Sequence, residues 1–284
     1  MADHIWVSTN GDWSSTSSWH DGAVPAAGDR ALLLTGSQSV TAGLNQSAVD
    51  NLTVVLDEDY HGSVGSSGSP LQGGTGWTVA LEARNAPEVH LDLGDSFEVH
   101  VLSTSANANA LVLDGGGSSA KAYIRAAHTV TLAASLTLDE LYLLTAAARA
   151  RLLSGLTLGD AHVDGGLVFC DAAVTNIHMR EGHWIHQGTN THDVTMLEVH
   201  GGTFELAGCT GAVISVAKVF GGTVDARRDK TTKTITAAAV YPRGALLLDN
   251  GADTITATVT RIGGLVTGGS NVTVNETVPY LGLR

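Results

Sequence analysis

A phased series of glycines in the second half of the chain constrains the fold more than any other feature. The glycines follow short stretches in which apolar and polar residues alternate, and they lie at positions 166, 182, 202, 222, 244 and 264. The intervals between neighbouring members are 16, 20, 20, 22 and 20 residues. Such alternation is the period of a half-buried β-strand, and glycine lets the backbone turn between strands. Because chance would not hold this phase through six members, the sequence indicates a structural repeat.

A repeat of this length predicts a parallel β-solenoid. A chain that returns to the same point after each coil can pair every strand with the coils above and below it. One coil cannot bury its own apolar side, so the coils stabilise one another only as a stack. Helices fit poorly, because Gly, Thr and Val are frequent and no apolar stripe of helical period persists. We therefore expect an all-β fold, a parallel β-solenoid (β-helix) with coils of about 20 residues.

Upstream of the glycine series, the phase is looser but the strand pattern continues. Short alternating strands are predicted at residues 77–83, 88–93, 97–102, 110–114, 122–126 and 129–132. The alanine-rich residues 146–153 and 236–240 could be helical, although the repeat favours strand or turn at both places. We expect residues 1–72 to form an N-terminal capping segment and residues 73–284 to form the solenoid.

Three tryptophans mark the capping segment. Trp6, Trp13 and Trp19 lie within fourteen positions, among Ser, Thr and Gly. They could close the end of the solenoid, whose core and strand edges would otherwise be exposed. They could instead form an exposed platform that stacks on sugars. We favour the cap, and these three residues with Tyr60 are the candidate interaction residues.

The residues around the second and third tryptophans carry a resemblance. Trp13 and Trp19 are followed by the turn Gly22-Ala-Val-Pro25 and by Gly28-Asp29, directly before an apolar run. This arrangement resembles the leading element of many β-helical surface and virion proteins. The continuation through residues 43–49, 51–56 and 60–65 is similar to proteins encoded among the structural genes of tailed bacteriophages.

The resemblance implies a virion component, most simply a head decoration or cement protein that bridges capsid subunits. It implies the major capsid protein and other virion proteins as partners, self-association as a homotrimer, and assembly into the virion in the host cytoplasm. The alternative is a tail-associated adhesin or a glycan-processing β-helix protein. The resemblance is confined to the capping segment, and beyond it only the texture of the repeat agrees.

Composition argues against nucleic acid and against a membrane. The formal charge is −13, whereas binding to phosphate backbones needs clustered Lys and Arg. One basic cluster exists, which we interpret as a solvated loop because two aspartates are interspersed in it. It comprises Arg227, Arg228, Lys230 and Lys233, with Asp225 and Asp229. The chain shows no secretory signal and no apolar run long enough to span a membrane, so neither is expected.

The residues typical of metal and redox sites do not form recognised motifs. The two cysteines, Cys170 and Cys209, are expected to be buried apolar residues about two coils apart. The densest histidines are expected to be solvated or stacked and not to bind metal, although a trimer axis could bring three copies of one histidine together. These histidines are His178, His183, His186, His192 and His200.

Acidic residues offer the best case for chemistry, because glycan-cleaving β-helices use carboxylates on adjacent coils. Three pairs lie four residues apart, where aspartate is also common for its own turn-forming reasons: Asp160 and Asp164, Asp225 and Asp229, Asp249 and Asp253. Glu205 and Asp225 are expected to lie one coil apart in register. We expect no catalytic residue, no cofactor and no enzymatic activity.

Overall fold

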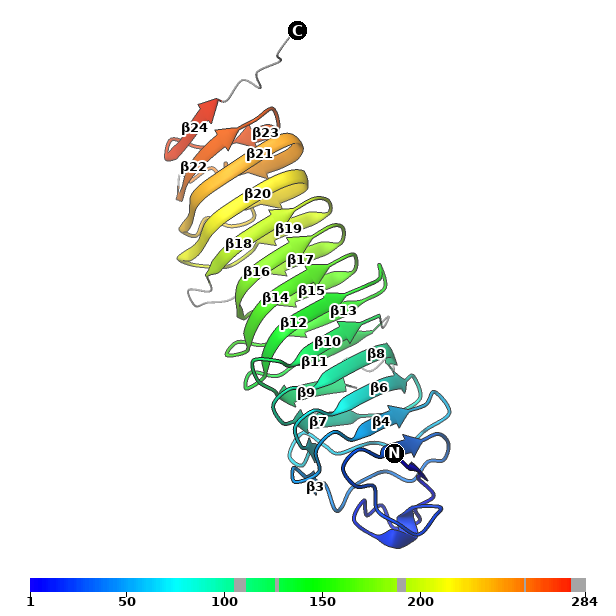
Figure 1. Ribbon diagram of the computed structural model, residues 1–284. Helices are drawn as coiled ribbons and strands as arrows, with labels where there is room; N and C mark the ends of the chain where they lie inside the picture. The colour runs from blue at the N-terminus through cyan, green and yellow to red at the C-terminus, as the bar shows by residue number, and fades with distance from the viewer. Residues whose placement is uncertain (105–110, 126–127, 188–192, 253, 277–284) are drawn as a thin grey trace. The chain divides into compact units, whose positions relative to one another are not determined.

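The structure is a computed structural model that describes residues 1–104, 111–125, 128–187, 193–252 and 254–276. Its internal contacts divide the chain into two units, Met1–Thr157 and Leu158–Arg284. In each unit the strands run parallel in stacked coils, as Figure 1 shows, and the predicted all-β solenoid is confirmed. No helix in the described part of the chain is long and apolar enough to cross a membrane.

The first unit consists of short strands and one 3-10 turn, η1 (Thr16–Ser18). Its strands are β1 (Asp3–Ile5), β2 (Arg30–Leu33), β3 (Asn45–Gln46), β4 (Thr53–Leu56), β5 (Leu71–Gly73), β6 (Thr78–Ala83), β7 (Val89–Leu93), β8 (Glu98–Thr104), β9 (Leu111–Gly115), β10 (Lys121–Ile124), β11 (Thr129–Leu132), β12 (Thr137–Leu143) and β13 (Arg149–Leu152). The strands predicted between residues 77 and 132 are found as β6 to β11, and Ala110 and Ala126 lie outside the described residues.

Two parallel ladders build the first unit. One ladder pairs β1, β2, β4, β6, β8, β10 and β12 in that order. The other pairs β3, β5, β7, β9, β11 and β13. Because β4 pairs with β6, parallel pairing runs without interruption across the expected boundary at residues 72 and 73. The capping segment thus contributes coils of its own.

In-register columns of apolar side chains fill the inside of the first unit. One column follows the first ladder and is at most 3% exposed: Val54, Val79, Val99, Ala122 and Leu141. Inward and outward residues alternate along each strand, which is why the sequence shows a period of two. Burial of each Val or Leu contributes about 1.5–3 kcal/mol, and only the neighbouring coils supply that burial.

The second unit follows the same plan, with two of its strands long enough to join both ladders. Its strands are β14 (Thr157–Val163), β15 (Leu167–Cys170), β16 (Ala173–Met179), β17 (His183–His186), β18 (Val194–Val199), β19 (Thr203–Leu206), β20 (Ala212–Asp225), β21 (Lys233–Leu247), β22 (Ile255–Arg261), β23 (Leu265–Thr267) and β24 (Val272–Glu276). The alanine-rich residues 149–152 and 236–240 are strand, in β13 and β21 respectively.

The regularly spaced glycines found in the sequence mark the register in which the strands of this unit pair. Leu167 pairs with His183, His183 with Thr203 and Thr203 with Thr223, and each of these residues directly follows a glycine of the series. Gly222 then pairs with Gly244, and Ala245 with Leu265, which continues the register to the last glycine. The inward column beside these residues is fully buried: Val168, Trp184, Phe204, Val224 and Leu246.

Gly222→Ala should therefore destabilise the protein more than Gly208→Ala. Both glycines have a positive φ, +69° and +74°, where an alanine costs about 1 kcal/mol. A Cβ on Gly222 would also lie 2.5 Å from the Gly202 carbonyl oxygen, whereas a Cβ on Gly208 would meet nothing within 4 Å. Urea unfolding of the two variants measures the difference, and equal losses would contradict the tight coil-to-coil contact.

Candidate functional site

The four candidate interaction residues lie inside the first unit. Trp6, Trp13, Trp19 and Tyr60 are between 0% and 3% exposed. The Trp19 ring packs edge-on against the other two indoles, with centroids 5.2 Å from Trp6 and 4.9 Å from Trp13. This burial agrees with the cap interpretation, and the alternative of exposed indoles that stack on sugars is wrong for the described chain.

Three of these four rings bond their polar group to a backbone carbonyl, whereas Trp13 Nε1 is buried without a hydrogen-bond partner among the described residues. Trp19 Nε1 donates to the Trp13 carbonyl at 2.8 Å. Trp6 Nε1 and the Tyr60 hydroxyl both donate to the Gln38 carbonyl, at 3.2 and 2.7 Å. The aromatic rings therefore hold together segments of the first coils that are far apart in sequence.

A buried histidine stands beside this cluster. His4 places Nδ1 2.9 Å from Asp21 and Nε2 3.2 Å from Asp29. Burial by itself would lower the pKa of His4, but the two carboxylates outweigh it and raise the pKa above its usual value. The contacts of His4 with both carboxylates therefore tie β1 to the turns that precede β2.

The histidines singled out in the sequence do not converge on one point. His178 lies between Asp160 and Glu198, at 3.8 and 3.3 Å, and its ring stacks on His162. The ring of His200 stacks on Phe220 at 4.6 Å. His183 contacts Glu205, His186 is fully buried, and His192 lies outside the described residues. The described chain holds no cluster of three or more His, Cys, Asp or Glu placed for a metal.

The predicted register of Glu205 and Asp225 is confirmed. The two residues are direct partners on β19 and β20. His183 Nε2 lies 3.1 Å from Glu205, which also pairs with Arg228, and Arg227 binds Asp225 through two nitrogens at 3.0 and 2.8 Å. The outward column continues on the preceding coils with Ile185 and Phe169.

This carboxylate pair is charge-compensated. Hydrogen bonds from the Arg227 guanidinium, the largest influence, hold the pKa of Asp225 below its usual value. A general acid for glycoside cleavage needs the opposite shift. The pair is thus better suited to binding a polar ligand, or to holding coils together, than to protonating a leaving group.

The remaining candidate carboxylates are spread over the unit. Asp160 accepts a hydrogen bond from Asn176, and Asp164 pairs with Arg180 at 3.2 Å. Asp249 accepts the Gly251 amide at 3.1 Å, and Asp253 lies outside the described residues. The Asp249 contact is a local turn bond of the kind that the sequence interpretation expected, whereas the contacts of Asp160 and Asp164 join neighbouring coils.

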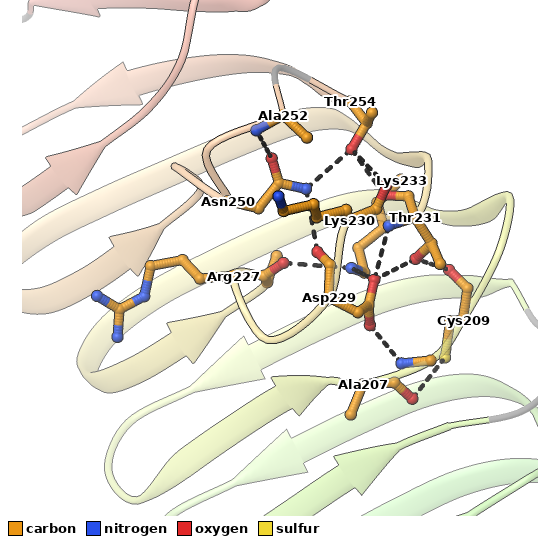
Figure 2. A network of polar contacts seen from close by, with 12 residues as sticks. Ala207, Cys209, Arg227, Asp229, Lys230, Thr231, Lys233, Asn250, Ala252 and Thr254 are labelled. Atoms are coloured by element: carbon orange, nitrogen blue, oxygen red, sulfur yellow. Dashed lines mark hydrogen bonds and ion pairs between the residues drawn. The ribbon is translucent and has the colours of Figure 1, made fainter.

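The basic cluster contains a buried ion pair that the sequence interpretation missed. Lys233 is 0% exposed, so the prediction of a solvated loop is wrong at this residue. Its Nζ contacts Asp229 Oδ1 at 2.6 Å (Figure 2). The same Nζ donates to the Ala226 carbonyl at 3.2 Å. A buried charged group is stable only when it is paired with an opposite charge and hydrogen-bonded, and the Lys233 ammonium group meets both conditions.

The Asp229 carboxylate gathers donors from neighbouring loops (Figure 2). It accepts the backbone amides of Gly208 and Thr231, while Asn250 Nδ2 donates to the Asp229 carbonyl at 3.1 Å. Burial works to raise the pKa of Asp229, but bonds from Lys233, Thr231 and Gly208 dominate and lower it to about 2. This network connects the loops of three successive coils.

The two thiols are buried and separate. Neither Cys170 nor Cys209 forms a disulfide, and both are 0% exposed, as expected. Burial raises the pKa of Cys209 to about 12, and it raises that of Cys170 as well. Such thiols are inert packing groups, because the reactive form is the thiolate.

Outward side chains on successive coils form what we call cross-coil ladders. In the first unit, His100, Tyr123 and Tyr142 stack with centroids 4.7 and 4.8 Å apart. In the second, Phe220 stacks between His200 and Tyr241. Sequence reasoning missed these ladders, although aromatic residues recurring 19 to 23 positions apart were the available signal.

Charged side chains form ladders as well. Lys121 binds Glu140 at 2.8 Å beside the Tyr123 stack, and Lys218 binds Glu198 at 2.8 Å on the second unit. Glu198 also contacts His178 on the preceding coil. Because ionic and aromatic partners sit in register, they add to the stability of the coil stack and keep the outer faces regular.

Hollows on the first unit are small. One of about 400 Å³ lies beside β3 and β5, and one of about 210 Å³ lies over β7 and β9 under the turn at Ser66. His90 lines the latter, where burial, the dominant influence, lowers its pKa even though Glu88 is 3.7 Å away. The first hollow lies within the usual size range of small-ligand sites, about 300–1,000 Å³, and the second lies below it.

Comparisons with protein-family models, with curated proteins and with solved structures find no match to this chain.

Asp229→Asn should cost about 3 kcal/mol of unfolding free energy, because it leaves the buried Lys233 without its counter-charge. Asp225→Asn is the matched control, since its partner Arg227 reaches solvent, and a much smaller loss is expected. Thermal and urea unfolding at neutral pH measure both. Similar losses in the two variants would contradict a special role for the buried pair.

The Asp229–Lys233 pair makes the free energy of unfolding depend on pH. A carboxylate with a depressed native pKa stabilises the fold above its unfolded pKa, about 3.9, and this stabilisation disappears as pH falls toward 2. Asp229→Asn should therefore flatten that part of the stability curve, which urea unfolding at a series of acidic pH values measures. An unchanged curve in the variant would contradict the assignment.

Proposed function

We propose that this chain is a non-enzymatic structural protein of a tailed-phage virion, one that decorates the head and clamps neighbouring capsid subunits. The observation that carries the proposal is the set of cross-coil ladders, in which charged and aromatic side chains pair with one another along regular outer faces. Side chains that are already paired with one another are poorly suited to catalysis in a cleft. They favour instead the docking of a partner over a wide area. The resemblance of the capping segment to phage structural proteins supports the same role.

The charge distribution favours a partner with a positive surface. Residues 1–157 hold 16 acidic and 6 basic side chains, a net charge of −10. Residues 158–284 hold 12 acidic and 9 basic side chains, a net charge of −3. Complementary charge raises the rate of encounter and fixes orientation, and it weakens with salt. We propose the major capsid protein as that partner and a homotrimer as the assembled form.

Binding to heads tests this role. Purified protein should co-sediment saturably with procapsids or expanded heads that lack it, and binding should weaken at high salt. Glu58→Lys with Asp59→Lys, in the acidic first unit, should weaken binding more than Glu181→Lys with Asp249→Lys in the second. No binding to either form of the head would overturn the capsid role, and a strict monomer in sedimentation would overturn the trimer.

The second candidate is a tail-associated glycan-binding protein. The observation that favours it is the in-register pair Glu205 and Asp225, with Arg227, Arg228 and His183 around it. Paired carboxylates and guanidinium groups are typical of sites that bind sugar hydroxyls through charge-assisted hydrogen bonds.

A glycan array separates the two candidates. The structural role predicts no saturable glycan signal. Binding or turnover that is lost in Glu205→Gln and Asp225→Asn, but kept in Glu198→Gln on another face, would replace the capsid proposal with the glycan one. Glu198 is the matched control because it too is paired with a basic residue across coils.

A further inference from the structure

The chain contains two Asn-Gly dipeptides, Asn10-Gly11 and Asn250-Gly251, and the structure treats them differently. In such a dipeptide the glycine nitrogen can attack the asparagine side-chain amide. Both glycines have a positive φ, +73° and +68°, and both asparagines accept the backbone amide two residues on at 3.1 Å. The two sites are therefore alike in backbone and differ in the groups around the side chain.

At Asn10, a buried hydroxyl joins the nucleophile to the amide oxygen. Ser8 is 7% exposed, and its Oγ accepts the Gly11 amide at 2.9 Å while it donates to Asn10 Oδ1 at 2.9 Å. Asp12 N also donates to Asn10 Oδ1, which fixes which end of the amide is oxygen. Ser18 Oγ lies 3.1 Å from the same oxygen and donates at 2.5 Å to the Asp12 carbonyl.

These contacts match the proton movements of cyclisation. When Gly11 N bonds to Asn10 Cγ, the nitrogen must lose a proton and Oδ1 must gain one. Ser8 Oγ is hydrogen-bonded to both atoms. It can therefore accept the proton of Gly11 N while it transfers its own hydroxyl proton to Asn10 Oδ1. The Asp12 amide stabilises the negative charge that develops on Oδ1, as an oxyanion-hole donor does.

Asn250 has the equivalent amide donor, because Ala252 N donates to its Oδ1 at 3.1 Å, but the contacts of its described neighbours include no hydroxyl bonded to both Gly251 N and that oxygen. Its Nδ2, the leaving group, is held by the Asp229 carbonyl at 3.1 Å and by Thr254 Oγ1 at 2.8 Å. The Gly251 amide donates to Asp249 Oδ1 at 3.1 Å, and the contacts described for Asp249 do not connect it to the Asn250 oxygen. The bonds at Asn250 oppose departure of ammonia, whereas those at Asn10 favour attack.

We propose that Asn10-Gly11 is a self-modifying site, at which Ser8 relays the proton for cyclisation. The Gly11 N–Cγ bond forms, the Cγ–Nδ2 bond breaks and ammonia leaves, which gives a succinimide. Water then opens the ring to aspartate or isoaspartate. No oxidant, metal or second protein is required.

The modification falls inside the capping segment, where residues 11–13 are hydrogen-bonded to residues 41–42. The Gly11 carbonyl accepts the amides of Thr41 and Ala42, at 2.9 and 3.1 Å, and Trp13 N donates to the Ala42 carbonyl. Isoaspartate adds one methylene to the main chain at this point. A Cβ on Gly11 would already lie 2.7 Å from the Ser39 carbonyl, so there is little room for a longer backbone. Isoaspartate at residue 10 therefore loosens the tryptophan cluster.

Peptide mass spectrometry of the full-length protein, incubated at neutral pH, tests the proposal. Asn10 should convert faster than Asn250 in the same sample, and faster than a synthetic peptide of residues 5–16. Ser8→Ala should slow Asn10 on the order of 100-fold, the low end of what a positioned proton transfer supplies. Ser8→Thr, which keeps the hydroxyl, should restore the rate.

The Asn250 rate reports whether the Asp229 network stays closed in each variant, because it rises if that network opens. If Ser8→Ala disturbs the fold, the comparison of wild-type protein with the peptide decides the question. The proposal is overturned if Asn10 reacts no faster than the peptide. It is equally overturned if Ser8→Ala leaves the Asn10 rate unchanged while Asn250 stays protected.

Discussion

Parallel hydrogen bonding between successive coils is the constraint on which the rest of this structure depends. Each inner strand of a ladder is hydrogen-bonded to the coil before it and to the coil after it, so no coil is stable alone. Once the register is set, inward residues stack into one apolar column and outward residues stack into ladders. The column through Val168, Trp184 and Phe204 and the ring stack of His200 on Phe220 are two results of the same pairing.

The sequence predicted this pairing where a glycine recurs at the same corner of each coil. The glycines between 166 and 264 mark the same corner of each coil, so their spacing is the register, and the alignment of Glu205 with Asp225 followed from it. In the first unit, Thr53 pairs with Thr78 and Thr78 with Glu98, so successive coils there differ in length. Loops of unequal length obscure the register in the sequence, and for that reason the stack of His100 on Tyr123 was missed although the aromatic spacing carried a signal.

The buried Lys233 shows a different limit. It stands two positions before Ile235, and strand alternation places both side chains on the inner face. The even spacing of Lys233 and Ile235 was a signal that Lys233 is buried. The interpretation of the four basic residues as one solvated loop overrode that signal. What decides the burial is the loop from Ala226 to Thr231, which supplies a carbonyl and a carboxylate to the ammonium group. Such a loop conformation depends on contacts with neighbouring coils and is not encoded locally.

Stacking in register also changes which substitutions affect one another. On a helix, a surface residue interacts with positions three or four away, whereas here Lys121 meets Glu98 and Glu140, each a whole coil distant, in its own column. A change of charge in one coil alters the environment of the coils on either side before it alters that of its chain neighbours. Compensating changes during evolution should therefore lie a full coil apart, and the set of separations at which they occur would map the coil boundaries of related chains.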